Sequence, residues 1–328
     1  KGGGRKRLID IYPRLEQNFL DVLCDHTAGD PMREGVKWTD LTRREISQRL
    51  AERGTPAGKR VVRQLLKRHG YVKRKARKSQ TMGPRHPDRN AQFRNIARLK
   101  QEYLEAGQPV VSMDTKKKEL LGNFYRDGRL YTQQAIEVFD HDFPSAASGA
   151  VFPHGLYDVG LNCGHINLGT SHETSQFACD SIEQWWRQEG RRRYPQATRL
   201  LLLCDGGGSN SANRYVFKEE LQGLADRLAL EIRVAHYPPY CSKYNPIEHR
   251  LFPHVTRACQ GVVFHTVQVV KGLMEKTKTS TGLRVTVDIL DKAYDIGRKC
   301  AKGFRENMKI VFDDFLPKWN YRAIPAVT

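Results

Sequence analysis

The chain has 328 residues, enough for two domains with a buried core, and its 39% hydrophobic and 28% charged residues are typical of a globular protein. This balance excludes wholesale disorder. No apolar run approaches the roughly 18 residues of a membrane helix. The N-terminus, KGGGRKRL, lacks the apolar core of a signal peptide. We therefore expect a cytoplasmic protein without a membrane partner.

The positive charge is concentrated in the first third of the chain. The formal net charge is +19; residues 1–100 contain 26 lysines and arginines against 10 acidic residues, whereas residues 101–328 contain 29 against 26. This asymmetry indicates nucleic acid, or another polyanion, as the partner of the first third. The seven cysteines form no C-x-x-C pair, which argues against a disulfide framework and against a zinc ribbon.

Residues 1–80 predict a basic, all-α region with a helix-turn-helix. Two short apolar stripes flank a turn at Gly54, and Thr55 and Pro56 suit the N-cap and first position of the second helix. An earlier helical stripe is formed by Leu15, Phe19, Leu20 and Leu23, and the two stripes around the turn are formed by Ile46 and Leu50, and by Val61, Val62, Leu65 and Leu66.

The second of these helices has a polar side that is typical of a recognition helix, and the basic arm YVKRKARK follows it. The residues predicted to bind DNA are Lys59, Arg60, Arg63, Gln64, Lys67 and Arg68 on the helix, and Lys73, Arg74 and Lys75 in the arm. The alternative is a solvated basic face on a small helical domain.

The rest of the chain predicts a connecting helix over residues 81–108 and a mixed α/β domain over residues 109–328. The connecting helix has Phe93, Ile96, Leu99 and Tyr103 on one side. After it we expect a strand at VVSMD, a hairpin formed by GLYDVG and HINLG, and a helix whose Thr170 and Glu173 have capping-box spacing. The strand RLLLLC, a helix, the strand EIRVAHY and a helix at NPIEHRLF follow. This order is compatible with a ribonuclease H-like mixed sheet flanked by helices.

Three carboxylates mark the ends of these elements. Asp114 ends the strand VVSMD, Asp205 follows RLLLLC, and Glu248 lies in the first turn of the helix at NPIEHRLF. If the two strands are parallel neighbours, Asp114 and Asp205 emerge side by side at the edge where open α/β sheets place their chemistry. Carboxylates crowded there would repel one another strongly unless cations lay between them.

This set of carboxylates predicts a divalent-metal site for phosphoryl transfer. Hard oxygen ligands with room for water and phosphate suit Mg²⁺ or Mn²⁺. Two such ions, roughly 3.5 to 4 Å apart, would activate an attacking water or 3′-hydroxyl and stabilise the leaving oxygen. Glycines 206–208 would clear the approach of a phosphodiester backbone, and Ser209 and Asn210 would cap the following helix.

Each carboxylate also has a structural interpretation. Asp114 alone is more commonly a turn residue at a strand end, with the KKKE that follows as a solvated hairpin. Asp205 equally suits a tight turn before an N-cap at GGGSN. Glu248 suits a capping box with Asn245, with Pro246 at the first helical position. The catalytic interpretation therefore depends on all three occurring in the right order on the right elements.

Other motifs give no site. DGGGSNS lacks the Lys-Ser/Thr of a phosphate-binding loop and the third glycine of a dinucleotide site. The pairs Cys24-x-His26 and Cys163-x-His165 lack partners at zinc spacing. His236 and His249 lie near the proposed carboxylates, where a contact to DNA or water is one interpretation and a hydrogen-bonded spectator role is the commoner one.

Several blocks of the sequence are distinctive: DTKKKELLGNF, HDFP, GLYDVGLNCGHINLG, FACDSIEQWW, CDGGGSN, LQGLAD, YPPYCSKYNPIEHRLF and KWNYRAIP. Together they resemble a bacterial insertion-sequence family of DDE transposases, distantly related to the mariner-like superfamily. GGGRKRL, WTDLT and HPDRNAQF extend the likeness over nearly the whole chain. In departure from the family, YCSKYNP replaces a PGTSKWN-like run. Family members usually carry another small helical segment before GGGRK, and this sequence starts at that stretch, as either a truncated piece or a shortened copy of such a protein would.

The resemblance implies a ribonuclease H-like catalytic domain in which Asp114, Asp205 and Glu248 match the DDE positions and bind Mg²⁺ or Mn²⁺. Such enzymes cut at the ends of their element and join the freed 3′-hydroxyl to target DNA. The residues flanking the third carboxylate would line the site or contact DNA. They are Lys243, Asn245 and Arg250.

By the same analogy, the chain is expected to act on double-stranded DNA as a homodimer or higher assembly, at the nucleoid if the source is bacterial. Two rival functions remain open. One is a transposase-derived DNA-binding regulator without catalytic activity; the intact set of carboxylates argues against it. The other is a different ribonuclease H-like nuclease, such as a structure-specific resolvase.

Overall fold

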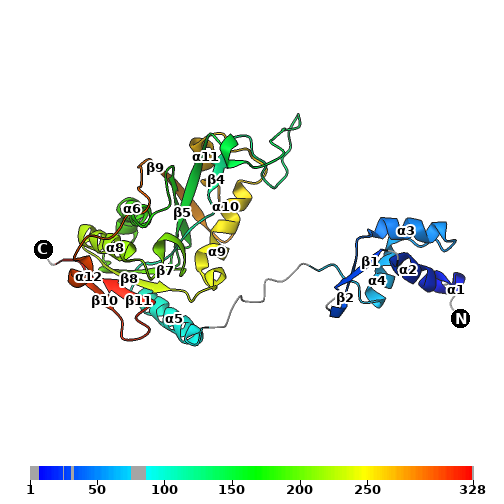
Figure 1. Ribbon diagram of the computed structural model, residues 1–328, viewed down its shortest axis with the longest axis horizontal. Helices are drawn as coiled ribbons and strands as arrows, with labels where there is room; N and C mark the ends of the chain where they lie inside the picture. Colours follow the sequence, from blue (N-terminus) through cyan, green and yellow to red (C-terminus); the bar gives the residue numbers. More distant parts are fainter. Residues whose placement is uncertain (1–6, 25, 31–32, 75–85, 327–328) are drawn as a thin grey trace. The chain divides into compact units, whose positions relative to one another are not determined.

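The computed structural model describes residues 7–24, 26–30, 33–74 and 86–326 (Figure 1). The chain divides into two compact units, Lys1–Gln80 and Thr81–Thr328, which we call the N-terminal unit and the C-terminal unit. Within the described ranges, no helix combines the length and the apolar character needed to cross a membrane.

The N-terminal unit is built on three amphipathic helices whose apolar stripes meet in one core. Helix α3 begins with a capping box, because the Thr42 hydroxyl accepts from the Glu45 N–H and the Glu45 carboxylate accepts from the Thr42 N–H (3.3 and 2.6 Å). The core contains Leu15, Phe19, Val22, Leu23, Ile46, Leu50, Ala57, Val62 and Leu65. The elements are α1 (Leu8–Ile11), α2 (Leu15–Cys24), β1 (Thr27–Asp30), β2 (Arg33–Thr39), α3 (Arg43–Glu52) and α4 (Lys59–Arg68).

Three details of this unit differ from the prediction. The region is not all-α, because β1 and β2 pair as an antiparallel ribbon. Helix α4 begins at Lys59 with Gly58 as its N-cap, so Thr55 and Pro56 precede the helix. The Thr55 hydroxyl is buried and donates to the Leu50 carbonyl (3.2 Å), which explains why it is not available as a cap. Leu20 is 38% exposed, and Val22 takes its place in the core.

The C-terminal unit contains a mixed sheet of nine strands within the described residues, in the order β10-β11-β8-β7-β3-β5-β6-β9, with β4 paired to β5. The pairs β3/β5 and β5/β6 are antiparallel, whereas β3/β7 and β7/β8 are parallel. A hairpin extended by parallel strands is the predicted ribonuclease H-like arrangement. The strands are β3 (Val110–Thr115), β4 (Glu119–Leu121), β5 (Gly149–Asp158), β6 (Cys163–Gly169), β7 (Arg199–Cys204), β8 (Glu231–His236), β9 (Arg284–Leu290), β10 (Ile310–Phe312) and β11 (Asn320–Ala323).

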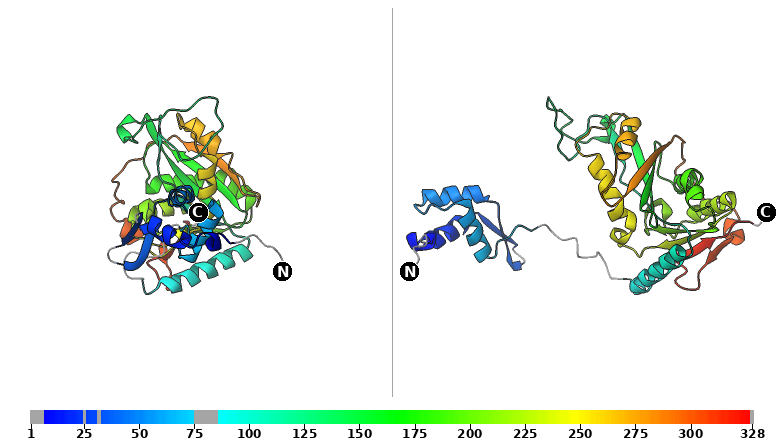
Figure 2. Two further views of the ribbon diagram at one scale, coloured as in Figure 1. Left: turned by 90° about the vertical axis from the view of Figure 1, so that its right-hand side faces the viewer. Right: turned by 180° about the vertical axis from the view of Figure 1, so that it is seen from behind.

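Helices cover both faces of this sheet, as Figures 1 and 2 show. Along β7, Leu200 and Leu202 pack with α6 and α8, whereas Leu201 and Leu203 pack with α5. The alternation buries the strand on both faces and accounts for its continuous apolar sequence. The helices are α5 (Arg89–Glu105), α6 (Ser175–Trp185), α7 (Arg191–Arg193), α8 (Tyr215–Leu228), α9 (Pro246–Arg250), α10 (Phe252–Ala258), α11 (Val267–Met274) and α12 (Phe304–Asn307).

Helix α5, predicted as a connecting helix, packs against the sheet as part of the C-terminal unit. Its Ile96, Leu99 and Tyr103 are buried as the sequence predicts. A buried amide network also holds it, since Gln92 Nε2 donates to Asn320 Oδ1 (2.9 Å) and Asn320 Nδ2 donates to Gln92 Oε1 (2.8 Å). The sequence gives no periodic signal for this polar contact, because the partners lie 228 residues apart.

Two predicted helix caps are wrong. Helix α6 has Thr174 as its N-cap, whose hydroxyl accepts from the Phe177 N–H (3.1 Å), so Thr170 and Glu173 form no capping box there. Helix α8 begins at Tyr215 after Arg214. Ser209 and Asn210 belong instead to a short 3₁₀ turn, Gly208–Asn210, and do not cap the helix.

Candidate active site

Asp114 and Asp205 lie at the ends of two adjacent parallel strands. The register pairs Ser112 of β3 with Leu203 of β7, and continuing it by two residues sets Asp114 level with Asp205. Residues in register on neighbouring strands point to the same face, and such strands lie about 4.8 Å apart. Both carboxylates therefore emerge together on the face covered by α5 and α9.

Helix α9 brings Glu248 to the same place because its first turn is hydrogen-bonded to the end of β3. The Ile247 N–H donates to Ser112 Oγ (2.9 Å), and Asn245 Nδ2 donates to the Met113 carbonyl (3.1 Å). Ser112 Oγ in turn donates to Asn245 Oδ1. Sequence reasoning missed Ser112, although a polar residue inside the apolar run VVSM was the signal for it.

A glycine opposite Asp114 allows this helix to approach the sheet. Gly155 of β5 pairs with Asp114. A Cβ atom at Gly155 would lie 2.7 Å from the Phe252 ring and 2.8 Å from Ile247 Cδ1, closer than side-chain atoms pack. The segment that carries Glu248 therefore needs glycine at this position of the neighbouring strand.

The electrostatics at Asp114 reflect the proximity of the other two carboxylates. Burial, the charge of Asp205, and the charge and hydrogen bond of Glu248 raise the pKa of Asp114 to about 8, against the N–H of Thr115, which donates to Asp114 Oδ1 (2.8 Å). Among the described residues, no basic side chain forms an ion pair with Asp114, Asp205 or Glu248. The cluster thus gathers acidic groups that no basic side chain of the described ranges compensates.

His236 positions the main chain at Asp205. It is fully buried, and burial chiefly lowers its pKa to about 4, so the ring is neutral at physiological pH. Its Nδ1 lies 2.9 Å from the Asp205 carbonyl, which only accepts, and its Nε2 lies 2.9 Å from the Tyr321 hydroxyl. Nδ1 therefore carries the proton. The alternative of a DNA contact is wrong for His236, because its ring has no exposed surface, whereas His249 is exposed.

The chemistry of the donor set fits a hard divalent cation. Carboxylate oxygens are the ligands that Mg²⁺ and Mn²⁺ prefer, and a cation would offset both the burial and the repulsion that raise the pKa of Asp114. Across the described ranges, no group of three or more acidic, histidine or cysteine side chains is arranged to hold a metal ion. The carboxylates therefore form an electrostatic cluster that is not closed into a ligand shell.

The residues flanking Glu248 divide into two kinds. Asn245 is 0% exposed, and both polar atoms of its side chain are bonded within the protein, so its predicted DNA contact is wrong and it is a positioning residue. Its amide also does not cap α9, although Pro246 does begin that helix. Lys243 and Arg250 are exposed and remain available to DNA.

The predicted DNA-binding side chains of α4 lie on its exposed side. Lys59, Arg60, Arg63, Gln64, Lys67 and Arg68 are all exposed, as are Lys73 and Arg74 in the arm. Arg68 forms an ion pair with Glu16 (3.2 Å), and this pair links α4 to α2. Lys75 lies outside the described residues.

The chain matches the Rhodopirellula transposase DDE domain over residues 18–325. No curated protein sequence matches it. Similar solved structures include the Mos1 transposase paired-end complex with the left transposon end (12% identity, TM-score 0.45) and the mariner Mos1 paired-end complex with Mg (13% identity, TM-score 0.46). Each covers 84% of this chain and 73% of the Mos1 chain. Because the family match spans most of the sequence, the chain belongs to the Rhodopirellula family of transposases with a DDE domain.

Proposed function

We propose that the protein is an active DDE transposase, in which Asp114, Asp205 and Glu248 are the catalytic carboxylates. The observation that supports this most directly is that Asp114 and Asp205 end adjacent parallel strands at one sheet edge and that α9 carries Glu248 to it. Burial and the charges of the other two carboxylates raise the pKa of Asp114, and no basic side chain of the described chain compensates them. A partly buried cluster of like charges destabilises a fold, so its presence is best explained by a function that needs it.

The three carboxylates would hold Mg²⁺ or Mn²⁺, as a pair of ions. When bound, the metal supplies activation of the attacking oxygen and stabilisation of the leaving oxygen in phosphodiester cleavage and strand transfer. The protein's own part is to fix the carboxylates in place. Ser112 and Asn245 hold α9 against β3, and His236 holds the main chain at Asp205.

The glycines after Asp205 support access of a DNA strand to this edge. A Cβ atom at Gly206 would meet only the Tyr237 carbonyl at 3.5 Å, and one at Gly207 would meet Asp205 Oδ2 at 3.5 Å, which are ordinary contacts. The fold itself therefore does not require glycine at these positions. An approaching phosphodiester does, because side chains here would stand in its way.

The N-terminal unit would bind the terminal inverted repeats through the exposed side of α4. Its affinity for DNA should fall steeply with salt, on the order of a thousandfold between 50 and 200 mM if about six phosphates are contacted. A flat salt dependence would contradict this assignment. Such a protein would work in the cytoplasm, at the bacterial nucleoid.

Assembly of two or more chains on DNA is part of the same proposal. The segment between β4 and β5 extends away from the sheet in Figures 1 and 2 and exposes large apolar side chains. These are Tyr125, Leu130, Tyr131, Ile136, Phe139 and Phe143. An exposed apolar set of this kind marks an interaction surface. Light scattering with and without DNA measures the assembly, and a monomer under both conditions would contradict it.

The test of catalysis uses linear DNA that contains the sequences flanking the gene, incubated with the full chain and Mn²⁺. The wild type should give nicked strands and joined products, and Asp205→Asn should give neither. Asp314→Asn, a change of an exposed aspartate, is the matched control and should cut like the wild type. Equal nicking by Asp205→Asn would remove the catalytic assignment. DNA binding without nicking would favour the regulator, and cutting of junctions without joined products would favour a resolvase.

A further inference from the structure

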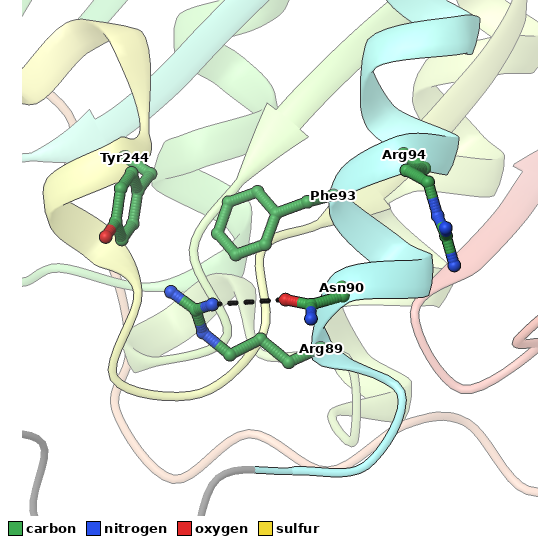
Figure 3. A pocket seen from close by; sticks show the side chains of 5 residues that line it. All are labelled: Arg89, Asn90, Phe93, Arg94 and Tyr244. Carbon is green, nitrogen blue, oxygen red and sulfur yellow. Dashed lines mark hydrogen bonds between the residues drawn. The ribbon is translucent and has the colours of Figure 1, made fainter.

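A basic and aromatic pocket lies beside the proposed active site. It has a volume of about 380 Å³ and is formed between the start of α5 and the 3₁₀ turn Ser242–Tyr244 that leads into α9 (Figure 3). The side chains that line it are Arg89, Asn90, Phe93, Arg94 and Tyr244. Tyr244 is 44% exposed, so its ring is accessible from solvent.

The geometry of the pocket combines aromatic surfaces with a fixed guanidinium. Phe93 and Tyr244 meet edge to face, with ring centroids 5.1 Å apart and an interplanar angle of 75°. The Arg89 guanidinium lies 4.8 Å from the Phe93 centroid and 5.5 Å from the Tyr244 centroid. Two hydrogen bonds hold the guanidinium in place. Its Nε donates to Cys241 Sγ (3.3 Å), and its Nη1 donates to Asn90 Oδ1 (3.4 Å), the bond drawn in Figure 3.

The positive charges of the pocket have no acidic partner. Within the part of the chain that the structure describes, Arg89, Arg94 and the neighbouring Lys243 form no ion pair with a carboxylate. Lys243 Nζ lies 5.2 Å from the centroid of the Tyr244 ring. Cations gathered around aromatic rings without internal compensation indicate an anionic ligand that also offers a flat surface.

Hydrogen bonds connect this pocket to the carboxylates. Gln92, one turn into α5, donates from Nε2 to the His236 carbonyl (2.9 Å), and the His236 ring donates to the Asp205 carbonyl (2.9 Å). On the other wall, Tyr244 directly precedes Asn245, which is bonded to β3 next to Asp114. The pocket and the carboxylates therefore share one edge of the sheet and one face of it.

Nucleotides combine an anionic phosphate with a flat base, and the aromatic rings decide which nucleic acid fits. In duplex DNA the base faces are covered by their neighbours, so a duplex presents phosphates and groove edges to a protein. An unpaired base exposes its face, which stacks on aromatic side chains and on arginine. A site for duplex phosphates alone would not need Phe93 and Tyr244.

We propose that this pocket binds an unpaired nucleotide of the DNA strand next to the cleavage site, with its base against Tyr244 and Phe93 and its phosphate at Arg89 and Arg94. The inference rests on the proposed function, because it assigns the strand that the carboxylates cut. It adds a requirement for local unpairing of DNA at the active site, which the carboxylates alone do not imply.

The test compares two DNA probes that carry the same charge. One is a duplex with a short single-stranded thymidine extension, and the other carries abasic residues in place of those thymidines. With the full chain in Ca²⁺ buffer, the wild type should bind the thymidine probe about tenfold more tightly than the abasic probe, the effect of one stacked base. Equal affinity for the two probes would overturn the proposal.

Variants locate the effect in the pocket. Tyr244→Ala should bind both probes equally, whereas Tyr244→Phe should keep the preference because it keeps the ring. Tyr240→Ala removes a tyrosine that is 73% exposed and does not line the pocket, and it should behave as the wild type. Arg94→Glu should weaken binding of both probes alike, since it changes charge without changing stacking. An unchanged preference in Tyr244→Ala would also overturn the proposal.

The outcome is independent of whether the enzyme cuts DNA. Base preference is measured by binding and is expected in Asp205→Asn as in the wild type, whereas the proposed function is tested by nicking. Nicking without a base preference would refute nucleotide binding by the pocket but would be consistent with the proposed transposase activity. If the protein does not nick DNA but shows a base preference that disappears in Tyr244→Ala, the result would support nucleotide binding by the pocket and refute the catalytic proposal.

Discussion

Two largely buried carboxylates near the start of the C-terminal sheet, Asp114 on β3 and Glu119 on β4, have opposite surroundings. The side chain of Glu119 is 16% exposed and is hydrogen-bonded to Lys116 and to Arg126. Burial acts to raise the pKa of Glu119, but the two cations outweigh it and lower that pKa. At Asp114, burial and the neighbouring carboxylates act in the same direction and raise the pKa to about 8.

The difference separates a charge that the fold balances from a charge that the described residues leave unbalanced. Glu119 has both of its cations within the chain, so its environment is complete without a ligand. Asp114 faces two further carboxylates, and among the described residues no basic side chain pairs with it, so a balancing cation would have to be supplied from elsewhere. A buried carboxylate whose charge the fold does not balance is therefore the stronger candidate for a site than a buried carboxylate as such.

The largest expected effect is on DNA cutting. Asp114→Asn should lower the rate of strand nicking by roughly a thousandfold or more, because it removes one of the carboxylates that we propose to be catalytic. Glu119→Gln should cut DNA at a rate within a few-fold of the wild type, measured at low temperature where the variant is folded. A loss of comparable size in both variants would mean that the two carboxylates do not differ in role.

The second effect is on stability, and here the change at Glu119 should be the damaging one. Glu119→Gln should lower the free energy of unfolding by about 3 kcal/mol, because Lys116 and Arg126 lose their buried anion. The control is Glu275→Gln, which breaks a more exposed pair with Lys271 and should cost about 0.5 kcal/mol or less. Urea titration measures both. Similar losses of unfolding free energy in the two variants would show that the ion pairs of Glu119 contribute no more to stability than an exposed pair.

Acid should reveal the buried neutral histidine behind Asp205. The pKa of His236 is lowered from 6.5 in the unfolded chain to about 4 in the fold, chiefly by burial. The unfolded chain therefore binds the extra proton first, and stability should fall as the pH falls from 6.5 towards 4. His236→Gln should reduce this slope by up to about 1.4 kcal/mol per pH unit. His154, whose burial lowers its pKa to about 3, remains in the variant and keeps part of the slope. An unchanged slope would contradict a neutral His236.

The smallest effect is a gain in stability. Without metal, Asp205→Asn should raise the free energy of unfolding by about 1 kcal/mol, because it removes the charge that repels Asp114. The asparagine oxygen can still accept from the Gly207 N–H, which Asp205 Oδ1 accepts at 3.1 Å. Addition of Mn²⁺ should raise the melting temperature of the wild type more than that of the variant. A destabilised variant would indicate that the three carboxylates do not repel one another.

The sequence could predict the fold because its signals are local and repeated. The apolar run Leu200–Leu203 predicts a strand buried on both faces, and the turn between β5 and β6 predicts their hairpin; both are confirmed. Helix caps were less predictable, since several hydroxyl and amide residues compete at each end. Thr174 rather than Thr170 caps α6, and the choice depends on where the chain leaves β6.

For the candidate site, the sequence could predict which residues are acidic and at which strand ends they lie. It could not predict what holds them, because those contacts join distant segments. Ser112 and Asn245 lie 133 positions apart, and their mutual hydrogen bond leaves Asn245 without a free group for DNA. His236 is similar, since its buried ring is distinguished from an exposed His249 only by the packing of β8 and β11.

The attachment of α9 to β3 has a consequence for the timing of synthesis. Asn245 donates to the Met113 carbonyl, 132 positions earlier in the sequence. Glu248 can therefore join the other carboxylates only after both β3 and α9 have been synthesised and folded. A chain still emerging from the ribosome, or one interrupted before α9, has two of the three acidic groups and no means to complete the set. If the proposed function holds, DNA cleavage would therefore require a chain that extends through α9.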